Sequence, residues 1–564
     1  MRTFLQKQPL LSSLFVNIGL FLLTYTLFYS RFGTTDDIEM QMVLSGKMVL
    51  QTPSAYLRYS HIWVGEILSS LYTFFPAVSW YTYCLVSAHF VGMTMLLYSI
   101  LKLNNTPFRL MTYIALFALG EVVLLQELQF TSASLVLQIG GIALLYWSFG
   151  QAKINKKSVL IAATAMLWAS MIRWESFGLA VVLGLPLLLL IIGQQPQKKL
   201  LKIAICLSII GSAWLSNKWH YHVHNQHEDW ATFHQYKHLG AGQAILDFHN
   251  PNYEWTASTA DDYFYKVGWE YGDLQLFKHW FFADSSVYGY AQFEALKYTF
   301  GDCPLPTDYR NQKIWDFFID YPLDDYVYHG FLVLLLCLVF LGGNRWQYST
   351  LLAIAVMILL LLASLFVYTH LPPRVSYGMG FYMMCLAALF FDYNTVMQRQ
   401  TKTWTLVLIG FLAISSLKKA TKSSAEVATQ TQYATQALDS LQAQPNQLYI
   451  GGGDYYLMPL ITPFRSMSDS IFEGFNMLDF GHLSNTPTHY QQLANFGIDN
   501  IHTTAIDDST IYLIHRPESS FLSWYADFVR RHYDKSIELE LVRKEEELDV
   551  AVYRMVSIIE TDKN

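Results

Sequence analysis

Apolar segments of membrane-spanning length recur along most of this chain, and they constrain its fold more than any other feature. A helix needs roughly 20 apolar residues to cross a bilayer, and about eleven segments meet this requirement. They lie near residues 10–29, 80–101, 108–126, 132–149, 158–172, 176–193, 201–216, 328–342, 350–368, 375–391 and 403–417. Of the 564 residues, 53% are hydrophobic and only 14% are charged. The sequence therefore predicts an all-α polytopic membrane protein.

The basic residues between these segments predict the orientation of the bundle. Lys and Arg are concentrated in alternate connections, which the positive-inside rule places in the cytoplasm. The residues that define this side are Arg2, Lys7, Lys102, Arg109, Lys153, Lys156, Lys157, Lys198, Lys199, Lys202, Arg345, Arg399 and Lys402. We therefore expect a multi-pass protein of the inner (cytoplasmic) membrane, with its N-terminus in the cytoplasm and its C-terminus outside.

Most of the predicted soluble mass lies on the outer side. It consists of outer loops 30–79 and 217–327, a polar linker 418–446 and a C-terminal region 447–564. Strands near 447–450, 510–514, 537–543 and 549–557, with a helix at 521–533, predict a small extracytoplasmic α/β domain there. If the apolar stretch 59–76 crossed the membrane, every later basic loop would lie on the outer side, against the positive-inside rule. We therefore expect it to form an amphipathic or re-entrant helix on the outer face.

Several functional classes are not indicated. The net charge is -7 and no basic-aromatic patch occurs, so no nucleic-acid partner is expected. No GxxxxGK[ST] sequence occurs. No CxxC or HExxH spacing indicates a dedicated zinc site. Because the cytoplasmic connections are short, any chemistry is expected to face outward.

Two adjacent carboxylates follow the first apolar segment, in the sequence Gly33-Thr34-Thr35-Asp36-Asp37-Ile38-Glu39-Met40. Ionised groups at a membrane boundary are costly and are often functional. One of Asp36 and Asp37 could act as a general base on an acceptor hydroxyl. The alternative is helix capping, with Thr35 or Asp36 at the N-cap and Glu39 near N3. Neighbouring side chains on a helix diverge by about 100°, so one aspartate could cap while the other reacts.

Other charged residues fall on the same predicted face. Glu127 ends the third segment, where it is either catalytic or an interfacial carboxylate in water. Arg173 and Glu175 end the fifth segment, and Arg374 follows two prolines between the ninth and tenth. Arginine binds phosphate bidentately, although Arg173 could instead pair with Glu175 or extend to lipid phosphates.

A histidine cluster begins the large outer loop, directly after a predicted helix end. It comprises His220, His222, His224 and His227, with His234 and His238 further on. Alternating histidines on a strand could bind metal, but an interfacial aromatic and polar belt explains them more simply.

The order of these features resembles the GT-C superfamily of polyprenyl-phosphate-sugar glycosyltransferases. Its members have a first span with the N-terminus inside, an acidic pair opening the first outer loop, and juxtamembrane helices before the second span. Asp36 and Asp37 match the acidic pair. In the protein mannosyltransferase and aminoarabinose transferase branches an HPPL-like sequence opens the second juxtamembrane helix, and Ser60-His61-Ile62-Trp63 lies there without the prolines. The resemblance covers residues 1–417.

This resemblance implies an inverting transfer of a sugar from a polyprenyl-phosphate donor to an extracytoplasmic glycan, protein or lipid, as in cell-envelope polysaccharide biosynthesis. The implied catalytic residues are Asp36, Asp37 and Glu127. The residues expected to bind the substrate phosphate are Arg58, His61, Arg173 and Arg374. A divalent cation, Mg or Mn, could assist the leaving phosphate, with Asp36 and Asp37 as possible ligands.

Other functions fit a polytopic chain as well. A transporter or flippase of lipid-linked sugars would more often show charges at the membrane midplane, broken helices and internal repeats. A polysaccharide polymerase or ligase would share the large outer loop and its arginines, without needing the acidic pair. A non-catalytic membrane scaffold is the remaining alternative.

Overall fold

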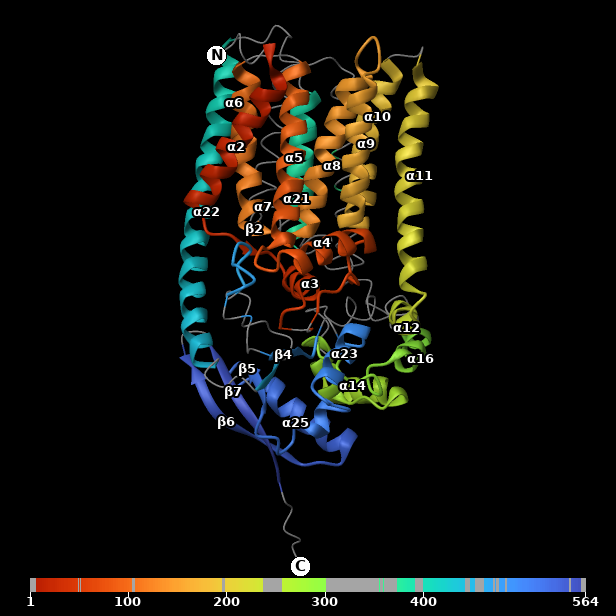
Figure 1. The fold of residues 1–564 in the computed structure, drawn as a ribbon, viewed down its shortest axis with the longest axis vertical. Helices are drawn as coiled ribbons and strands as arrows, with labels where there is room; N and C mark the ends of the chain where they lie inside the picture. Colours follow the sequence, from red (N-terminus) through yellow and green to blue (C-terminus); the bar gives the residue numbers. More distant parts are fainter. Residues whose placement is uncertain are drawn as a thin grey trace, which may run out of the picture.

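The structure is a computed structural model of the whole chain. It describes residues 7–48, 50, 52–103, 107–194, 198–236, 256–300, 355, 359, 373–390, 399–441, 447–451, 461–469, 472, 476–481, 484–546 and 549–558. Within these residues a bundle of long helices leads into a mixed α/β region at one end (Figure 1).

Helices from the first half of the chain form most of the described bundle. Among the described residues, five stretches are long and apolar enough to cross a membrane: Pro9–Leu27, Trp80–Leu103, Arg109–Gln126, Phe130–Phe149 and Lys199–His224. The bundle helices are α2 (Pro9–Leu27), α5 (Trp80–Leu103), α6 (Pro107–Leu116), η1 (Phe117–Glu121, a π-helix), α7 (Val122–Gln126), α8 (Phe130–Phe149), α9 (Lys156–Ile172), α10 (Trp174–Gln194), α11 (Lys199–His224) and α21 (Pro373–Phe390). These stretches support a membrane protein.

Helices α5 and α8 meet at two glycines. A Cβ on Gly140 would lie 2.3 Å from the carbonyl oxygen of Gly92, and one on Gly92 would lie 2.4 Å from that of Val136. Any side chain at either position would therefore push the two backbones apart. Small residues allow such close packing in membranes, where dispersion contacts replace the hydrophobic effect as the main attraction. This contact fixes α8, and hence its first turn, beside α5.

Two short helices lie at the end of the bundle that faces the α/β region (Figure 1). They are α3 (Thr35–Ser45) and α4 (Ile62–Phe74), and α4 lies across the bundle end rather than through it. The backbone N–H of His61 donates to the carbonyl of Met171 at 2.8 Å, and Ser60 Oγ donates to that of Ile172 at 2.9 Å. These bonds hold the start of α4 against the end of α9, in agreement with a non-spanning helix at residues 59–76.

Below these helices lies a five-stranded mixed sheet with strand order β4-β3-β5-β7-β6. Its strands are β3 (Leu448–Gly451), β4 (Asn476–Asp479), β5 (Ile511–His515), β6 (Ile537–Glu545) and β7 (Val550–Ser557). The pairs β3–β4 and β3–β5 are parallel, whereas β5–β7 and β6–β7 are antiparallel. Four of these strands and helix α25 (Ser520–Tyr533) lie within about two residues of their predicted positions, the usual precision of element boundaries.

Helices from the large loop after α11 pack beside this sheet. They are α12 (Glu228–Tyr236), α14 (Ala257–Phe264), α15 (Tyr271–Lys278) and α16 (Tyr290–Phe300). The C-terminal region adds two short helices, α23 (Pro487–Asn495) and α24 (Ile501–Thr504). Phe281, which follows α15, packs edge-on against Phe480 at 4.9 Å and against Phe528 of α25 at 5.1 Å. The large loop and the C-terminal region therefore share one apolar core.

Two sequence expectations differ from the structure in extent. Helix α22 runs unbroken from Arg399 to Leu441, so the segment predicted at 403–417 and most of the predicted linker form one helix of 43 residues. Helix α11 continues to His224, eight residues past its predicted end at 216. The predicted spans 328–342 and 350–368 fall almost wholly outside the described residues. The number of eleven spans and the domain limits stay predictions.

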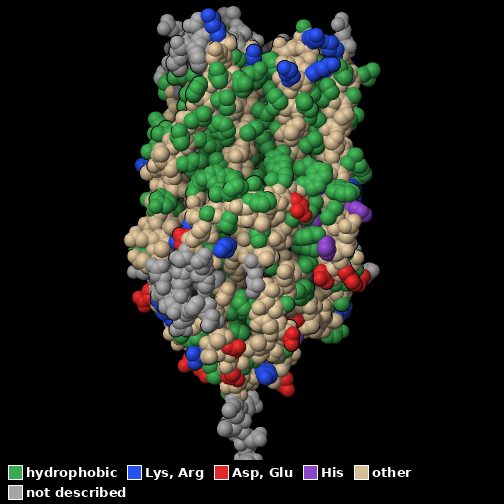
Figure 2. All heavy atoms as spheres, viewed as in Figure 1, with side chains coloured by type: hydrophobic (Ala, Val, Ile, Leu, Met, Phe, Trp, Pro, Cys, Tyr) green, Lys and Arg blue, Asp and Glu red, His purple; other side chains and the backbone are tan. Residues whose placement is uncertain are grey.

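The surface of the molecule is divided by chemistry. Figure 2 shows a broad hydrophobic band over the bundle, with Lys and Arg gathered at the end that carries the N-terminus and most acidic side chains at the other end. The orientation of this arrangement in a membrane stays the prediction made from the basic loops.

Candidate active site

The acidic pair lies in the first turn of α3, and its two members have different surroundings. Thr34 is the N-cap of the helix, one residue before the earliest cap that the sequence suggested. Asp37, not Glu39, occupies N3, and Thr34 Oγ1 donates to Asp37 Oδ2 at 2.7 Å. The N-cap therefore lies one residue before the predicted ones, because the polar run offers several equivalent caps, and the predicted capping box with Glu39 at N3 is not formed: Thr34 makes no side-chain bond to a helix amide.

Asp37 joins three elements and is fully buried. Its Oδ1 accepts hydrogen bonds from Tyr81 Oη of α5 at 2.8 Å and from the backbone N–H of Phe130, the first residue of α8, at 2.9 Å. Burial raises the pKa of Asp37 to about 7, although the hydrogen bonds from Thr34, Tyr81 and Phe130 act against this rise. Asp37 is thus a carboxylate held by neutral donors and by the positive end of a helix dipole.

A cluster of aromatic and arginine side chains around Tyr59 lies near Asp36. The guanidinium of Arg58 lies 4.8 Å and that of Arg173 lies 4.9 Å from the centroid of the Tyr59 ring. Arg173 also lies 4.9 Å from the ring centroid of Phe130, which stacks on Tyr59 at 5.8 Å. These cation–π contacts hold two positive charges at one half-buried ring.

Two carboxylates act on the same ring. Burial raises the pKa of Tyr59, Arg58 and Arg173 lower it, and Asp36 and Glu39 raise it further. Asp36 and Glu39 are three residues apart on α3, which places them on one face of the helix. Both are buried. We call Asp36, Glu39, Arg58, Tyr59 and Arg173 the Tyr59 cluster.

Arg173 has hydrogen-bonding capacity left over. Its Nε pairs with Glu175 Oε2 at 2.9 Å, which is the ion pair that the sequence offered as an alternative to phosphate binding. Its Nη1 is buried and has no hydrogen-bond acceptor within the part of the chain that the structure describes. A buried, charged donor without an acceptor is costly, so an anionic ligand at this atom would be stabilising.

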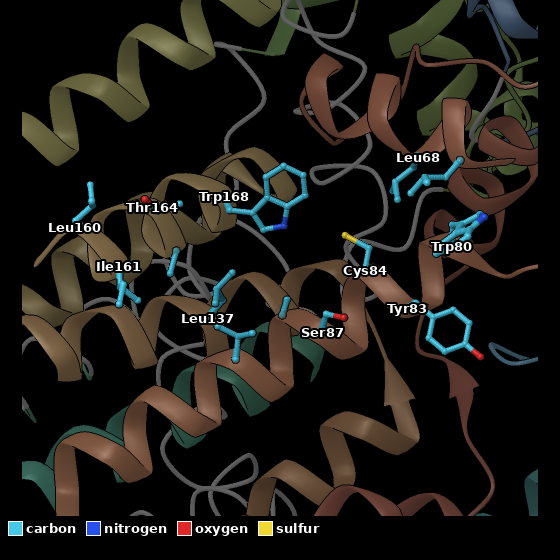
Figure 3. Close-up of a pocket in the computed structure, with 14 residues that line it drawn as sticks. Leu68, Trp80, Tyr83, Cys84, Ser87, Leu137, Leu160, Ile161, Thr164 and Trp168 are labelled. Atoms are coloured by element: carbon cyan, nitrogen blue, oxygen red, sulfur yellow. The ribbon is translucent and has the colours of Figure 1, made fainter. Parts of the chain in front are cut away.

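An apolar groove begins about one and a half helical turns from Arg173, between α4, α5, α8 and α9 (Figure 3). Its volume is about 660 Å³. The lining residues are Leu68, Leu71, Trp80, Tyr83, Cys84, Ser87, Ala88, Val91, Leu137, Leu160, Ile161, Thr164, Ala165 and Trp168. Leu160 and Ile161 are exposed at its rim, so the groove opens onto the apolar outer surface of the bundle.

Three further residues predicted for the site lie elsewhere or have other contacts. Glu127 lies on a two-residue ladder between β1 (Arg31–Phe32) and β2 (Glu127–Leu128), where its Oε1 pairs with Arg31 Nη2 at 2.6 Å. His61 is the N-cap of α4: its Nδ1 accepts from Trp63 N–H at 3.1 Å and its Nε2 lies 2.8 Å from the carbonyl oxygen of Ser216. Arg374 is the second residue of α21, and its side chain is outside the described set.

The start of α21 lies at the site end of the bundle. A Cβ on Gly378 would lie 2.8 Å from Leu135, in the second turn of α8. Arg374, one turn earlier, therefore belongs to the same end of the bundle as Phe130. The predicted order of the spans places both residues on the same side of the membrane.

The histidine cluster differs from its predicted setting. His220, His222 and His224 are part of α11 rather than of a loop after it, because the helix continues past its apolar segment. The buried ring of His224 packs 4.2 Å from His220 and 5.6 Å from His234, measured between centroids, and His238 is outside the described residues. Among the residues that the structure describes, no three His, Cys, Asp or Glu side chains are placed to hold a metal ion.

A further buried acid, Glu121, lies in the bundle. Glu121 ends the π-helix η1, and its Oε1 is 2.8 Å from Nδ1 of His89 on α5. His89 Nε2 in turn is 3.4 Å from Ser132 Oγ. π-Helices often coincide with such polar insertions, but these side chains are apart from the Tyr59 cluster.

Several residues of the site could not be predicted from the sequence. Tyr59, Tyr81 and Phe130 are ordinary aromatic residues, and they become site residues only because the chain before α4 and the starts of α5 and α8 converge on α3. The sequence predicts Glu39 only as a possible capping residue. Its position three residues after Asp36 is the signal that places both carboxylates on one face of the helix.

Comparison with known proteins gives one structural similarity. The apo crystal structure of ArnT from Cupriavidus metallidurans is 11% identical, with a TM-score of 0.40, over 95% of this chain and 97% of that one. The structure of ArnT bound to undecaprenyl phosphate is 13% identical, with a TM-score of 0.40, over 96% and 97%. No family model and no curated protein matches the chain.

Proposed function

We propose that this protein transfers a sugar from a polyprenyl-phosphate donor to an acceptor outside the cytoplasmic membrane. The observation that carries the proposal is the buried Nη1 of Arg173, a charged donor that has no acceptor among the described residues and lies near the carboxylates of α3. A site that pairs arginines with nearby acids suits a reaction in which a phosphate leaves while a hydroxyl loses its proton.

The donor would bind in two parts. Its phosphate would accept hydrogen bonds from Arg173, with Arg58 supplying a second positive charge at the Tyr59 ring. Its isoprenoid chain would lie in the apolar groove, which begins near the same end of α9 and opens toward lipid. Burial of this chain would contribute about 25 cal/mol per Å² of apolar surface.

We assign the role of general base to Asp36. It shares the α3 face that is turned to Tyr59 and the arginines, whereas the oxygens of Asp37 are occupied by Thr34, Tyr81 and Phe130. Asp36 would take the proton of the acceptor hydroxyl as that oxygen attacks the anomeric carbon. The bond from this carbon to the phosphate oxygen would break at the same time, releasing polyprenyl phosphate with inversion.

The remaining predicted residues receive other roles in this proposal. Asp37 would anchor α3 to α5 and α8, and His61 would position α4 along the groove. Glu127 would fix the chain before α3 through Arg31. Arg374 stays a proposed phosphate ligand because of the end of the bundle at which it lies. A divalent cation at Asp36 would be an addition to the arginines rather than a replacement for them.

The test is release of free polyprenyl phosphate from a panel of polyprenyl-phosphate sugars by the purified full-length protein, with membrane extract as the source of acceptor. Asp36→Asn and Arg173→Gln are run beside the wild type, and Lys422→Gln, an exposed position on α22, serves as a matched charge control. Release that requires Asp36 and Arg173 but not Lys422 supports the proposal. If release is lost in EDTA and restored by Mg²⁺, a divalent cation also takes part in the reaction.

No release from any donor would contradict the proposal. Movement of an intact lipid-linked sugar across a vesicle membrane, without its cleavage, would then favour a flippase or transporter. Formation of long polymers from a diphosphate-linked oligosaccharide would favour a polymerase.

A further inference from the structure

The C-terminal region reaches back to the helix that carries the acidic pair. Residues 461–469 pack against α2, α3 and the start of α5. Ile461 and Met467 are buried in the same apolar cluster as the membrane helices, not in the cluster that fills the core around α25. The same cluster also contains Tyr449, Tyr512 and Val552 of the sheet, so the segment packs where the bundle and the sheet meet.

Backbone bonds tie this segment to the start of α5. The N–H of Met467 donates to the carbonyl of Ala77 at 3.2 Å, and Ser79 Oγ donates to the carbonyl of Arg465 at 2.5 Å. Thr82 Oγ1 donates to the carbonyl of Pro463. Phe464 packs edge-on against Tyr25 of α2 at 4.8 Å.

One side chain continues the contact onto α3. The sulfur of Met467 accepts from Gln41 Nε2 at 3.0 Å, and Gln41 Oε1 lies 3.4 Å from the hydroxyl of Thr82. Both Met467 and Gln41 are fully buried. Gln41 is one helical turn after Asp37, which is itself held by Tyr81, the neighbour of Thr82 on α5.

We infer that Met467 is a positioning residue, through which the C-terminal region holds α3 and its acidic pair at the catalytic geometry. The inference rests on the proposed function, because it assigns to this segment an effect on the reaction at Asp36. Two adjacent residues of α5 fix two adjacent turns of α3: Tyr81 holds Asp37, and Thr82 joins Gln41 to residues 463–467. Without Met467, Gln41 would lose both its sulfur acceptor and the packing that closes this side of α3.

The test uses Met467→Ala in the full chain, with Met467→Leu as the volume-conserving variant. Met555→Ala is the matched control, because Met555 is equally buried but lies in β7, within the core around α25. Two quantities are measured: kcat and donor KM for release of polyprenyl phosphate, and hydrogen exchange of the α3 backbone amides.

We expect Met467→Ala to lower kcat roughly tenfold to a hundredfold, the range for small displacements of reacting groups, with donor KM nearly unchanged. The α3 amides should exchange faster in this variant than in the wild type. Met467→Leu should restore most of kcat and of the protection. Met555→Ala should leave both α3 exchange and kcat per folded molecule unchanged.

Wild-type kcat and wild-type α3 exchange in Met467→Ala would overturn the inference, and inactivity of Asp36→Asn in the same assay would show that the proposed function still holds. Equal losses in Met467→Ala and Met555→Ala would also overturn it, because the effect would then be general destabilisation. If the wild type releases nothing from any donor, the proposed function fails. Exchange of α3 then decides the structural part by itself.

Discussion

Two fully buried aspartates in this molecule are held in opposite ways. Asp37, at the end of the bundle, receives hydrogen bonds from two hydroxyls and one backbone amide. Asp273 on α15 receives two bonds from Arg531 of α25, at 2.6 and 2.8 Å, and lies 3.1 Å from His532 Nε2. One carboxylate has neutral donors, and the other has a bidentate cation.

The pKa values follow these partners. Burial tends to raise the pKa of both groups. At Asp37 it prevails and brings the pKa to about 7. At Asp273 the hydrogen bonds from His532 and Arg531, with the charge of Arg531, outweigh burial and lower the pKa. Equal burial therefore gives a group that titrates near neutrality in one place and a permanent ion pair in the other.

This difference separates a candidate site from a structural joint. Arg531 and Asp273 connect the large outer loop to the C-terminal region, 258 residues apart in sequence. Asp37 instead adjoins Asp36 and a cluster with an unsatisfied arginine donor. Perturbed groups next to unsatisfied ones are typical of functional sites, whereas a buried charge with every partner present is typical of an interface.

The largest expected effect is on activity at the first aspartate of the pair. Asp36→Asn should lower the rate of polyprenyl phosphate release by roughly 10²–10⁴-fold, the usual contribution of a general base. Its thermal midpoint should stay close to that of the wild type. The rate is measured at saturating donor and the midpoint by intrinsic fluorescence in detergent. A variant with near-normal turnover would remove Asp36 from the mechanism.

The second effect is on stability at the joint. Arg531→Met leaves Asp273 buried without its cation, so it should destabilise the C-terminal region by about 3–5 kcal/mol. Arg530→Met is the matched control, because Arg530 is more than half exposed and pairs only at the surface with Asp527; its cost should be below about 1 kcal/mol. Denaturant midpoints of the two variants are compared with that of the wild type. Equal midpoints would mean that the joint is not needed.

The third effect is an opposite pH dependence of the two aspartates. The pKa of Asp37 is raised from 3.8 to about 7, so the folded state holds a proton that the unfolded state has released. This contribution to stability is therefore lost as pH rises from about 4 to about 7. The pKa of Asp273 is lowered, so its contribution is lost as pH falls through the acid range. The thermal midpoint of the wild type relative to that of Asp37→Asn should therefore fall as pH rises from about 4 to about 7, because the opposite slope of the buried histidines is common to both proteins and cancels.

The smallest effect comes from a buried histidine in the C-terminal region. Burial, with a smaller effect of His502, lowers the pKa of His489 from 6.5 to about 4. The unfolded state gains a proton first as pH falls, so stability is lost between about pH 6.5 and 4. His489→Leu should flatten this part of the curve without changing the Asp37 slope, which has the opposite sign. A curve that is unchanged in His489→Leu would show that the ring is already solvated.

Sequence predicted the fold best where periodic or apolar patterns are strong. Five of the predicted spans, the lateral helix at 62–74 and the strands β5, β6 and β7 follow from hydropathy and alternation. Helix α11 exceeded its prediction because Asn217–His224 is polar yet remains helical when it packs against α4 and α12. The N-cap at Thr34 was missed because Thr34, Thr35 and Asp36 are all good caps.

Sequence predicted the site only in part. The acidic pair and Arg173 were found because charge is rare at a membrane boundary. The different surroundings of Asp36 and Asp37 could not be predicted, because the hydrogen bonds of Asp37 come from Tyr81 and Phe130, two residues that are distant in the sequence. The proposed role of Met467 depends on its contact with Gln41, which is 426 positions away in the sequence.

The most direct measurement compares Asp36→Asn, Asp37→Asn and Asp273→Asn in one preparation series, with polyprenyl phosphate release per folded molecule and thermal midpoint determined for each. We predict that Asp36→Asn loses release at a normal midpoint, whereas Asp273→Asn keeps release per folded molecule at a lowered midpoint. Asp37→Asn should reduce release less than Asp36→Asn does. Full release by Asp36→Asn, or loss of release in Asp273→Asn at a normal midpoint, would contradict the assignment of the site to α3.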